Sequence, residues 1–450
     1  MFWPFKKKKV NNELFAVKKS NENLETLKAS KLAEEAFDLA STIYSETGPR
    51  KAGSESSKKC ARILLEEFKK HSDDAIITSF RSSESAFYGS IKLLAITATV
   101  IIVLSFFSCT LLALLLFLFV SFVVVWEFFL CKGSDKTFFS KCDMTNVHCV
   151  IEPKEECLNT IIFTSHHDSA PLMNNKCSIV LSLYLPLIHW LILGLTCIVG
   201  FICDIFTLGL FDIGFPPLFQ IVLLIIMALT SIVYLNLYKL ITPEYSPGVG
   251  DNLISSCVLE ELSKYFKWKK DNNKGLKNTK LIFSSFDGEE CGIKGSAWWF
   301  NHHKEQFISP IVINLDCLYD SSELTILTKD VNGYVNLSNS LASMCAMKAE
   351  KMGYKVKMGY MGLFCGSTDA ASAARCGFDA VSIVCTSTTP NGKTYYHTKE
   401  DTIDKLDRAT IEEIISLCIK IVEENSICEK QEEKGLVLQD SSKKLAVMKS

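Results

Sequence analysis

Two long apolar blocks constrain how this chain can fold. No charged residue occurs between Leu93 and Trp126. A single helix over this block would be about 50 Å long, whereas the hydrocarbon core of a bilayer is about 30 Å thick. We therefore predict a helical hairpin that turns near Ser108-Cys109-Thr110 and crosses a membrane twice. The alternative is a buried helix of a soluble domain, but such helices rarely stay apolar for so long.

The second apolar block runs from Ser178 to about Leu240 and is interrupted between Asp204 and Pro217. Aspartate, glycine and proline residues in this interruption predict a polar turn, and each flanking half is long enough to span a bilayer. His189 lies in the first half. A histidine inside a membrane can be functional, but a single neutral imidazole beside Trp190 is expected to pack against a neighbouring helix.

Four crossings would return the chain to its starting side, so all soluble parts would share one side of the membrane. Lysines flank that side: Lys6 to Lys9, Lys92, Lys132, Lys136, Lys176 and Lys239. The turn of the second hairpin carries Asp204 and Asp212 and no basic residue. The positive-inside rule then places the soluble parts in the cytoplasm. The N-terminus has basic residues without an apolar segment behind them, so it is not a signal peptide.

Cysteine usage and charge narrow the class of protein further. The 18 cysteines are scattered singly, without a Cys-x-x-Cys pair. This pattern argues against thiolate zinc sites and favours free thiols in a reducing compartment. The net charge of -2 argues against nucleic acid as a partner, and the apolar blocks make the lipid bilayer an expected one.

Outside the two blocks the pattern alternates between strands and helices. Helices are expected at 31–45, 55–70, 252–266, 296–304, 337–351 and 410–424, and strands at 75–80, 147–151, 160–164, 280–286, 311–315, 324–327 and 380–385. This alternation predicts an α/β fold with a mixed, mostly parallel sheet flanked by helices. The predicted division is a basic cytoplasmic segment at 1–30, one soluble domain in three parts at 31–91, 132–177 and 242–428, hairpins at 92–131 and 178–241, and a charged disordered tail at 429–450.

A pair of glutamates follows one predicted buried strand. The strand from Leu281 to Phe286 leads directly into Asp287-Gly288-Glu289-Glu290. Ligands and catalytic groups collect at the carboxyl ends of strands in open α/β sheets. One carboxylate of such a pair could bind a metal while its neighbour acts as a general base.

Other predicted strand ends and turns carry metal-binding types of side chain. His166 and Asp168 follow the strand at 160–164 and point to one face in an extended chain, so the carboxylate could orient the imidazole. Asp251 lies in a turn that opens a helix, where it could cap the helix or bind a metal. Asp316 ends the strand at 311–315. His397 lies in a polar loop, before Glu400-Asp401-Thr402, which reads as a helix cap.

Taken together, these candidate ligands are rich in oxygen and need no thiol. Structural zinc sites prefer cysteine and closed coordination, whereas catalytic sites keep a position open for water. The set therefore favours a catalytic site, with enough ligands for two metal ions.

The order of these motifs resembles a known family. The matching segments are Gly48-Pro49-Arg50-Lys51-Ala52-Gly53-Ser54, His166-His167-Asp168-Ser169, Pro247-Gly248-Val249-Gly250-Asp251-Asn252, Gly288-Glu289-Glu290-Cys291-Gly292-Ile293-Lys294-Gly295-Ser296, Asn314-Leu315-Asp316, Ser367-Thr368-Asp369 and Tyr396-His397-Thr398-Lys399-Glu400-Asp401-Thr402. As an ordered set they resemble the zinc-dependent aminopeptidases of metallopeptidase family twenty-eight, which include vacuolar aminopeptidase Y and relatives of glutamate carboxypeptidase. The resemblance covers the soluble chain from about residue 31 to 428.

The resemblance implies two Zn²⁺ ions per chain and a role for each candidate residue. It implies Asp251 as the bridging ligand, His166 and Asp316 on one ion, and Glu290 and His397 on the other. Glu289 would be the general base, and Asp168 would orient His166. The His-x-Asp spacing selects His166 rather than His167 as the ligand.

The sequence departs from the family pattern at two places beside Asp251. Gly250 stands where the family often has a second aspartate, and Leu253-Ile254-Ser255 stands where it often has Ala-Ser-Gly. Neither position carries a ligand, so local packing is expected to differ rather than metal binding. The inserted hairpins are the larger departure, and the second must emerge beside the site because it separates the His166 and Asp251 motifs.

The function implied by the resemblance is that of a membrane-embedded zinc aminopeptidase that hydrolyses N-terminal residues of short peptides. A glutaminyl cyclase-like transferase shares the fold and is one alternative, although the segment from Gly292 to Ser296 favours the peptidase. A non-catalytic membrane receptor or scaffold is the other alternative. The sequence does not indicate an oligomeric state.

Overall fold

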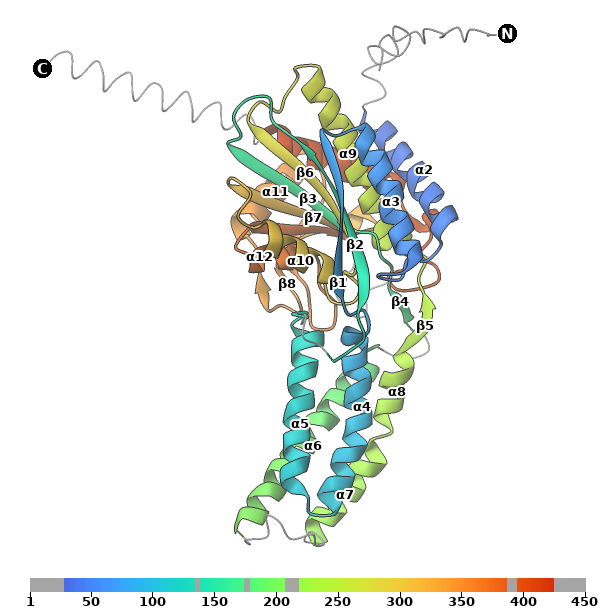
Figure 1. The fold of residues 1–450 in the computed structure, drawn as a ribbon, viewed down its shortest axis with the longest axis vertical. Helices are drawn as coiled ribbons and strands as arrows, with labels where there is room; N and C mark the ends of the chain where they lie inside the picture. Colours follow the sequence, from blue (N-terminus) through green and yellow to red (C-terminus); the bar gives the residue numbers. More distant parts are fainter. Residues whose placement is uncertain (1–27, 134–137, 174–178, 207–217, 387–394, 425–450) are drawn as a thin grey trace, which may run out of the picture.

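A computed structural model describes residues 28–133, 138–173, 179–206, 218–386 and 395–424. An α/β domain lies at one end of the molecule and a bundle of long helices at the other (Figure 1). The predicted tail at 429–450 and most of the segment at 1–30 lie outside the described residues.

The α/β domain is built on a nine-stranded sheet in the order β1-β2-β6-β3-β7-β11-β8-β10, with β9 paired to β8. The strands are β1 (Asp74–Ser82), β2 (Cys142–Ile151), β3 (Asn159–His166), β6 (Thr279–Phe286), β7 (Pro310–Leu318), β8 (Leu324–Asp330), β9 (Val335–Asn336), β10 (Lys357–Tyr360) and β11 (Asp379–Cys385). The central strands run parallel to one another: β6, β3, β7 and β11. Strand β2 pairs antiparallel with both β1 and β6, and β8 pairs antiparallel with β11. The mixed sheet with a parallel centre is therefore confirmed.

Helices cover both faces of this sheet because its central strands are apolar on both sides. Ile161 and Phe163 of β3 face a core shared with α2 (Ala29–Thr47), α3 (Glu55–Lys70), α9 (Ile254–Asp271), α11 (Asn339–Lys351) and a helix over 408–424. Ile162 faces a second core with α10 (Lys294–His303) and α12 (Ala370–Arg375). Each helix predicted from the periodicity of the soluble parts is present.

The bundle consists of two hairpins. Its helices are α4 (Ser85–Phe106), α5 (Thr110–Val124) with its continuation η2 (Val125–Phe129), α6 (Ile179–Phe206), α7 (Leu218–Thr230) and α8 (Val233–Leu240). Four helical stretches are long and apolar enough to cross a membrane: Ser85–Phe106, Thr110–Phe129, Ser182–Phe206 and Leu218–Leu237. The first hairpin turns where the sequence predicts, but its first helix begins at Ser85, earlier than the expected boundary at 92.

Two polar side chains inside the bundle find partners there. Asp204 was expected in a turn, yet it lies in the last turn of α6 and accepts a hydrogen bond from the Thr110 hydroxyl. This partner on α5 lets the carboxylate remain within the helix; the rest of the expected turn, including Asp212, lies outside the described residues. His189 contacts the Tyr234 hydroxyl and the Met227 carbonyl, each at 3.0 Å. Both its ring nitrogens are satisfied, which agrees with the expected packing role.

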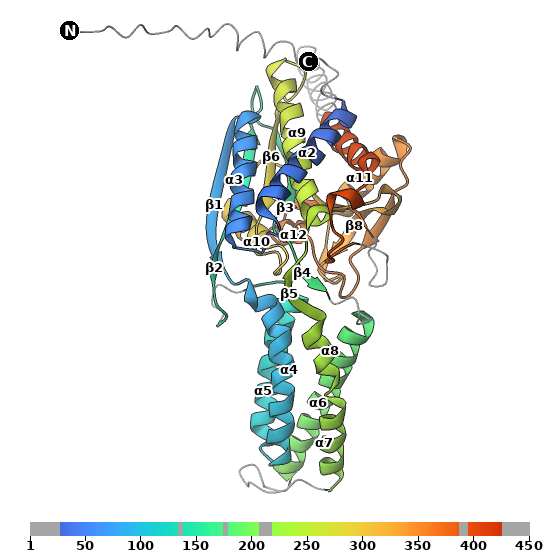
Figure 2. The same ribbon diagram turned by 90° about the vertical axis from the view of Figure 1, so that its right-hand side faces the viewer.

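Both hairpins join the domain at its end nearest the bundle. The first connects β1 to β2, its antiparallel neighbour. The second leaves from β4 (Pro171–Met173) and returns through β5 (Ile241–Tyr245), which pair as a separate ribbon between the two parts of the molecule (Figure 2). The cysteines in the described residues are unpaired thiols.

Candidate metal centre

The six predicted metal and base residues converge at the end of the sheet nearest the helix bundle. They are His166, Asp251, Glu289, Glu290, Asp316 and His397, all less than 9% exposed. His166 ends β3, and the glutamate pair follows its neighbour β6. Asp316 lies near the end of β7, the other neighbour of β3. Three adjacent parallel strands therefore bring their carboxyl ends to one site.

The Asp251 carboxylate lies between two groups of side chains. Its Oδ1 is 3.4 Å from His166 Nε2, which is in turn 3.8 Å from Asp316 Oδ1. Its Oδ2 is 3.3 Å from His397 Nε2, which lies 3.0 Å from Glu290 Oε2. Helix α9 has no side-chain cap, so Asp251 does not serve as one. Each group, completed by Asp251, has ligand atoms close enough for one metal ion.

Asp168 links the imidazole to the glutamate pair. Its Oδ1 is 3.3 Å from His166 Nδ1. The backbone N–H groups of Glu289 and Glu290 donate to its two oxygens, each at 3.2 Å. Asp168 is therefore placed to orient three residues of the cluster. His167 lies elsewhere, with its Nδ1 2.9 Å from the Ser285 hydroxyl.

A tight turn presents the two glutamates. Gly288 has a positive φ of 81°, and a Cβ there would lie 2.6 Å from Met144 Sδ. The amides of Gly292 and Ile293 both donate to the Glu289 carbonyl, at 2.8 and 2.7 Å. The glycine is required for this conformation, which directs both carboxylates into the cluster.

Two residues that support the site were not assigned these roles from sequence. The Arg50 guanidinium is fully buried and donates to the carbonyls of His167, Gly48, Pro247 and Gly248. It therefore ties the turn after His166 to the turn before Asp251. Its place in the Gly48-Pro49-Arg50 motif was the only sequence signal.

Asp401 holds the same turn from the other side. Its carboxylate accepts hydrogen bonds from the amides of Gly250 and Asp251, at 2.7 and 3.2 Å. The helix-cap interpretation of this residue was wrong, because the following short helix η5 (Ile403–Lys405) has no side-chain cap. The Asp401 carboxylate accepts hydrogen bonds from the backbone amides of Gly250 and Asp251 instead of from the first amides of η5.

The structure explains the glycine that departs from the family pattern. A Cβ at Gly250 would lie 2.1 Å from the Tyr319 ring. Tyr319 thus occupies the space beside Asp251 that a larger side chain at residue 250 would need. Asp251 still reaches the cluster.

The site is electrostatically crowded with acidic groups. Burial raises the pKa of Glu290 to about 8, and the charge of Asp251 adds to this shift. Burial also raises the pKa of Glu289 well above its usual range, with further contributions from Glu290 and Asp369. Burial would raise the pKa of Asp251 too, but the neighbouring His166 and His397 imidazoles outweigh it and hold this pKa below the usual range.

This donor set fits a zinc centre. Asp251 Oδ2, Glu290 Oε1 and both ring nitrogens of His397 are buried and have no hydrogen-bond partner among the described residues. Buried polar atoms normally have partners, and a divalent cation would supply one while neutralising the carboxylates. Imidazole and carboxylate ligands without thiolates are typical of catalytic zinc.

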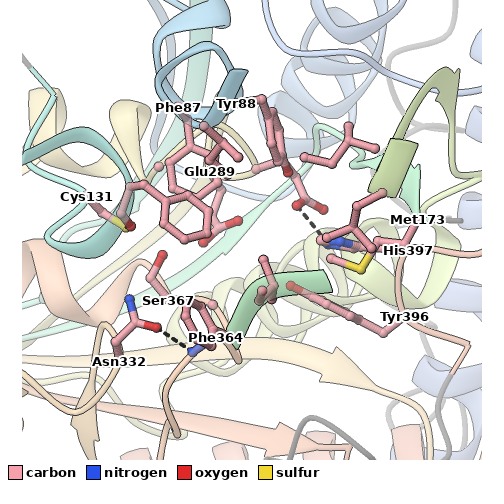
Figure 3. A pocket seen from close by; sticks show the side chains of 18 residues that line it. Phe87, Tyr88, Cys131, Met173, Glu289, Asn332, Phe364, Ser367, Tyr396 and His397 are labelled. Carbon is pink, nitrogen blue, oxygen red and sulfur yellow. Dashed lines mark hydrogen bonds and ion pairs between the residues drawn. The ribbon is translucent and has the colours of Figure 1, made fainter. Parts of the chain in front are cut away.

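A pocket opens beside the cluster toward the helix bundle. Glu289, Glu290 and His397 line it together with Phe87 and Tyr88 of α4, and Figure 3 shows Glu289 beside these two aromatic side chains. It contains about 730 Å³ of space between atoms, part of it open to solvent. The Met173 amide on the β4 strand donates to the His397 carbonyl at 3.0 Å, so the second hairpin does emerge beside the site.

Comparison with known proteins agrees with this geometry. The model of peptidase family M28 matches residues 237–422. Aminopeptidase YwaD of Bacillus subtilis is 27% identical over 190 residues, which are 41% of this chain and 38% of that protein. The chain therefore matches less than half the length of this relative.

Solved structures share the fold. BSAP, a zinc aminopeptidase from Bacillus subtilis, has a TM-score of 0.51 at 15% identity, covering 87% of this chain and 95% of its own. A glutaminyl cyclase from Bacteroides thetaiotaomicron has a TM-score of 0.50 at 11% identity, covering 87% of this chain and 97% of its own. The family model thus matches residues 237–422, and these solved structures share the fold of the chain.

Proposed function

We propose that this protein is a membrane-embedded zinc aminopeptidase. The observation that carries the proposal is the Asp251 carboxylate, whose two oxygens face two separate groups of buried ligands. In this proposal His166, Asp316 and Asp251 would hold one Zn²⁺, and Glu290, His397 and Asp251 would hold a second. When bound, Zn²⁺ lowers the pKa of water toward about 7 and polarises a carbonyl oxygen.

Glu289 is proposed as the group that moves the proton. Its Oε2 lies 3.8 Å from His166 Nε2, at the edge of the cluster and beside the pocket. The carboxylate takes a proton from the attacking water as its oxygen bonds to the peptide carbonyl carbon. It then delivers this proton to the nitrogen that leaves when the C–N bond breaks. Asp168 keeps both His166 and the Glu289 backbone in position for these steps.

The same substitution at two adjacent positions tests the assignment. Glu289→Gln is expected to lower turnover of aminoacyl substrates by roughly 10²- to 10⁴-fold, with zinc per chain unchanged. Glu290→Gln is expected to lower zinc content itself, because it removes a proposed ligand. Turnover in Glu289→Gln close to that of the unaltered protein would refute the assignment of the base. Full zinc content in Glu290→Gln would remove it from the ligand set.

A substrate screen on the detergent-purified protein separates the three functions. Release of N-terminal residues from dipeptides supports the aminopeptidase. Cyclisation of peptides with N-terminal glutamine would instead assign the transferase, whose fold the chain shares. A protein that binds no zinc and turns over neither substrate would fit the receptor or scaffold.

The membrane arrangement is part of the proposal. The four apolar helices are proposed to span the bilayer, with the lysine-rich side and the catalytic domain in the cytoplasm. A cysteine engineered in place of Asp212 is expected to react with an impermeant reagent only from the non-cytoplasmic side. Reaction from the cytoplasmic side alone would reverse the orientation.

A further inference from the structure

The pocket beside the glutamate pair adjoins a second hollow among the apolar helices. Ile91 of α4, Phe128 of η2, Leu183 of α6 and Phe364 line both spaces. The second hollow contains about 360 Å³ of space between atoms, part of it open to the outside. Its other lining residues are Leu94, Val124, Phe129, Pro186, Leu187 and Leu237. The two spaces therefore lie side by side, and a path from the candidate metal centre into the bundle would pass between the four shared side chains.

Polarity changes along this path. The end at the centre carries Glu289, Glu290 and His397. Every residue that lines the far end is apolar. From Tyr88 to Leu94 the path follows α4 for about 9 Å at the rise of an α-helix. Water finds no polar partners at the far end, so a suitable occupant has a polar reactive group and an apolar chain.

The junction between the two spaces is a fixed part of the structure. The Phe364 ring packs against Phe129 and Tyr184, with centroids 5.6 and 5.0 Å away. The Phe364 amide donates to Asn332 Oδ1 at 2.8 Å, and Asn332 Nδ2 donates to the Phe129 carbonyl at 3.1 Å. The loop that carries Phe364 is thus bound to the end of the first hairpin, which holds the wall of the path in place.

We propose that the site hydrolyses amides that carry a long alkyl chain, and that this chain lies in the hollow inside the bundle. The inference rests on the proposed function and narrows its substrate class. Water adds to the amide carbonyl carbon, the C–N bond breaks, and the leaving nitrogen takes a proton, which yields a carboxylic acid and an amine. The chain could be the side chain of an N-terminal residue or a fatty acyl group, since both present the same alkyl surface.

Two substrate series test the inference and distinguish these sources. One consists of 2-aminoalkanoyl anilides with side chains from propyl to decyl, and the other of N-alkanoyl amino acids over the same lengths. In the series that matches the natural source, kcat/KM is expected to rise about fourfold per methylene, until the hollow is filled. Equal kcat/KM for propyl and decyl members would overturn the inference and leave the aminopeptidase proposal intact. Failure to cleave any member would instead refute the proposed hydrolase.

Paired variants on α6 test where the chain lies. Leu187→Trp fills the hollow and is expected to lower the decyl-to-propyl ratio of kcat/KM by more than about tenfold, as the loss of two buried methylenes would. Leu191→Trp is the matched control, because Leu191 is 61% exposed on the outside of the same helix. The ratio cancels any general loss of folded protein. An equal ratio in both variants would overturn the assignment of the hollow.

Photolabelling gives a readout that needs no turnover. The Glu289→Gln protein is irradiated with an alkyl-diazirine amino acid amide, and the labelled peptides are sequenced. Label is expected on the α4 and α6 residues that line the hollow. Label confined to outward-facing positions such as Leu191 would overturn the inference, whatever the activity of the enzyme.

Discussion

A buried ion pair joins the first hairpin to the turn that carries Glu289 and Glu290, and breaking it should destabilise the protein strongly. Lys294 Nζ lies 2.8 Å from Glu127 Oε2, and the two side chains are 6% and 5% exposed. Glu127 lies in η2 at the end of the hairpin, and Lys294 begins α10, where its amide donates to the Gly288 carbonyl. The pair therefore connects the apolar helices to the turn that presents Glu289 and Glu290.

The magnitude follows from the burial. Glu127→Gln leaves a buried ammonium without a counter-charge, which costs about 3–5 kcal/mol of the free energy of unfolding. Lys294→Met leaves the buried Glu127 carboxylate without a counter-charge, which should lower the free energy of unfolding by a similar amount. The double variant Glu127→Met/Lys294→Met removes both charges and should recover most of the loss, because apolar replacements of buried pairs are often close to neutral.

Denaturant unfolding in detergent, followed by tryptophan fluorescence, measures the complete double-mutant cycle. Glu155→Gln is the control, since the Glu155–Lys277 pair is more than half exposed and should contribute less than about 1 kcal/mol. Two single variants that each lose less than 1 kcal/mol, or a double variant that loses their sum, would refute the reasoning.

Three further predictions concern the site and the core. Asp401→Asn should weaken zinc binding without removing a ligand, because it loosens the amides that hold Asp251; an unchanged zinc dissociation constant would contradict this. Chelation of zinc should lower the midpoint of thermal unfolding, and re-addition should restore it in a concentration-dependent way; a midpoint independent of zinc would argue against the centre. Burial raises the pKa of Glu261 to about 9 from an ordinary 4.5. Between these two pH values the folded state keeps a proton that the unfolded state has lost, so the free energy of unfolding falls as pH rises from 4.5 to about 9. Glu261→Gln should therefore flatten this dependence, and melting curves between pH 5 and pH 9 that remain parallel to those of the unaltered protein would contradict it.

Much of the fold follows from local patterns in the sequence. The helix at Glu55–Lys70 was expected at the same residues that the structure gives, because its apolar positions recur at helical spacing and Ser54 caps it. The predicted strands are present, but they were predicted shorter than they are. Strand β2, for example, begins at Cys142 rather than at 147. The missed residues pair with β1, a tertiary contact across the first hairpin.

The candidate site was predictable because its residues belong to motifs at strand ends. What the sequence could not show were contacts between distant turns. The local sequence predicts that Asp401 caps a helix, yet its carboxylate accepts a hydrogen bond from the backbone amide of Gly250, 151 residues away. Asp204 reads as part of a turn, yet a hydroxyl on another helix satisfies it. Both misreadings arose where a tertiary partner outweighed the local signal.

The order of strands in the sheet also has a consequence for synthesis of the chain. Strand β3 pairs only with β6 and β7, and β2 gains its second neighbour only from β6. When the ribosome has completed both hairpins, the domain therefore has a single strand pair, β1 with β2, and a β3 without neighbours. All four apolar helices emerge before the sheet can close. The His166 strand therefore stays without a neighbour until β6 (Thr279–Phe286) has been synthesised, which happens after all four apolar helices have emerged.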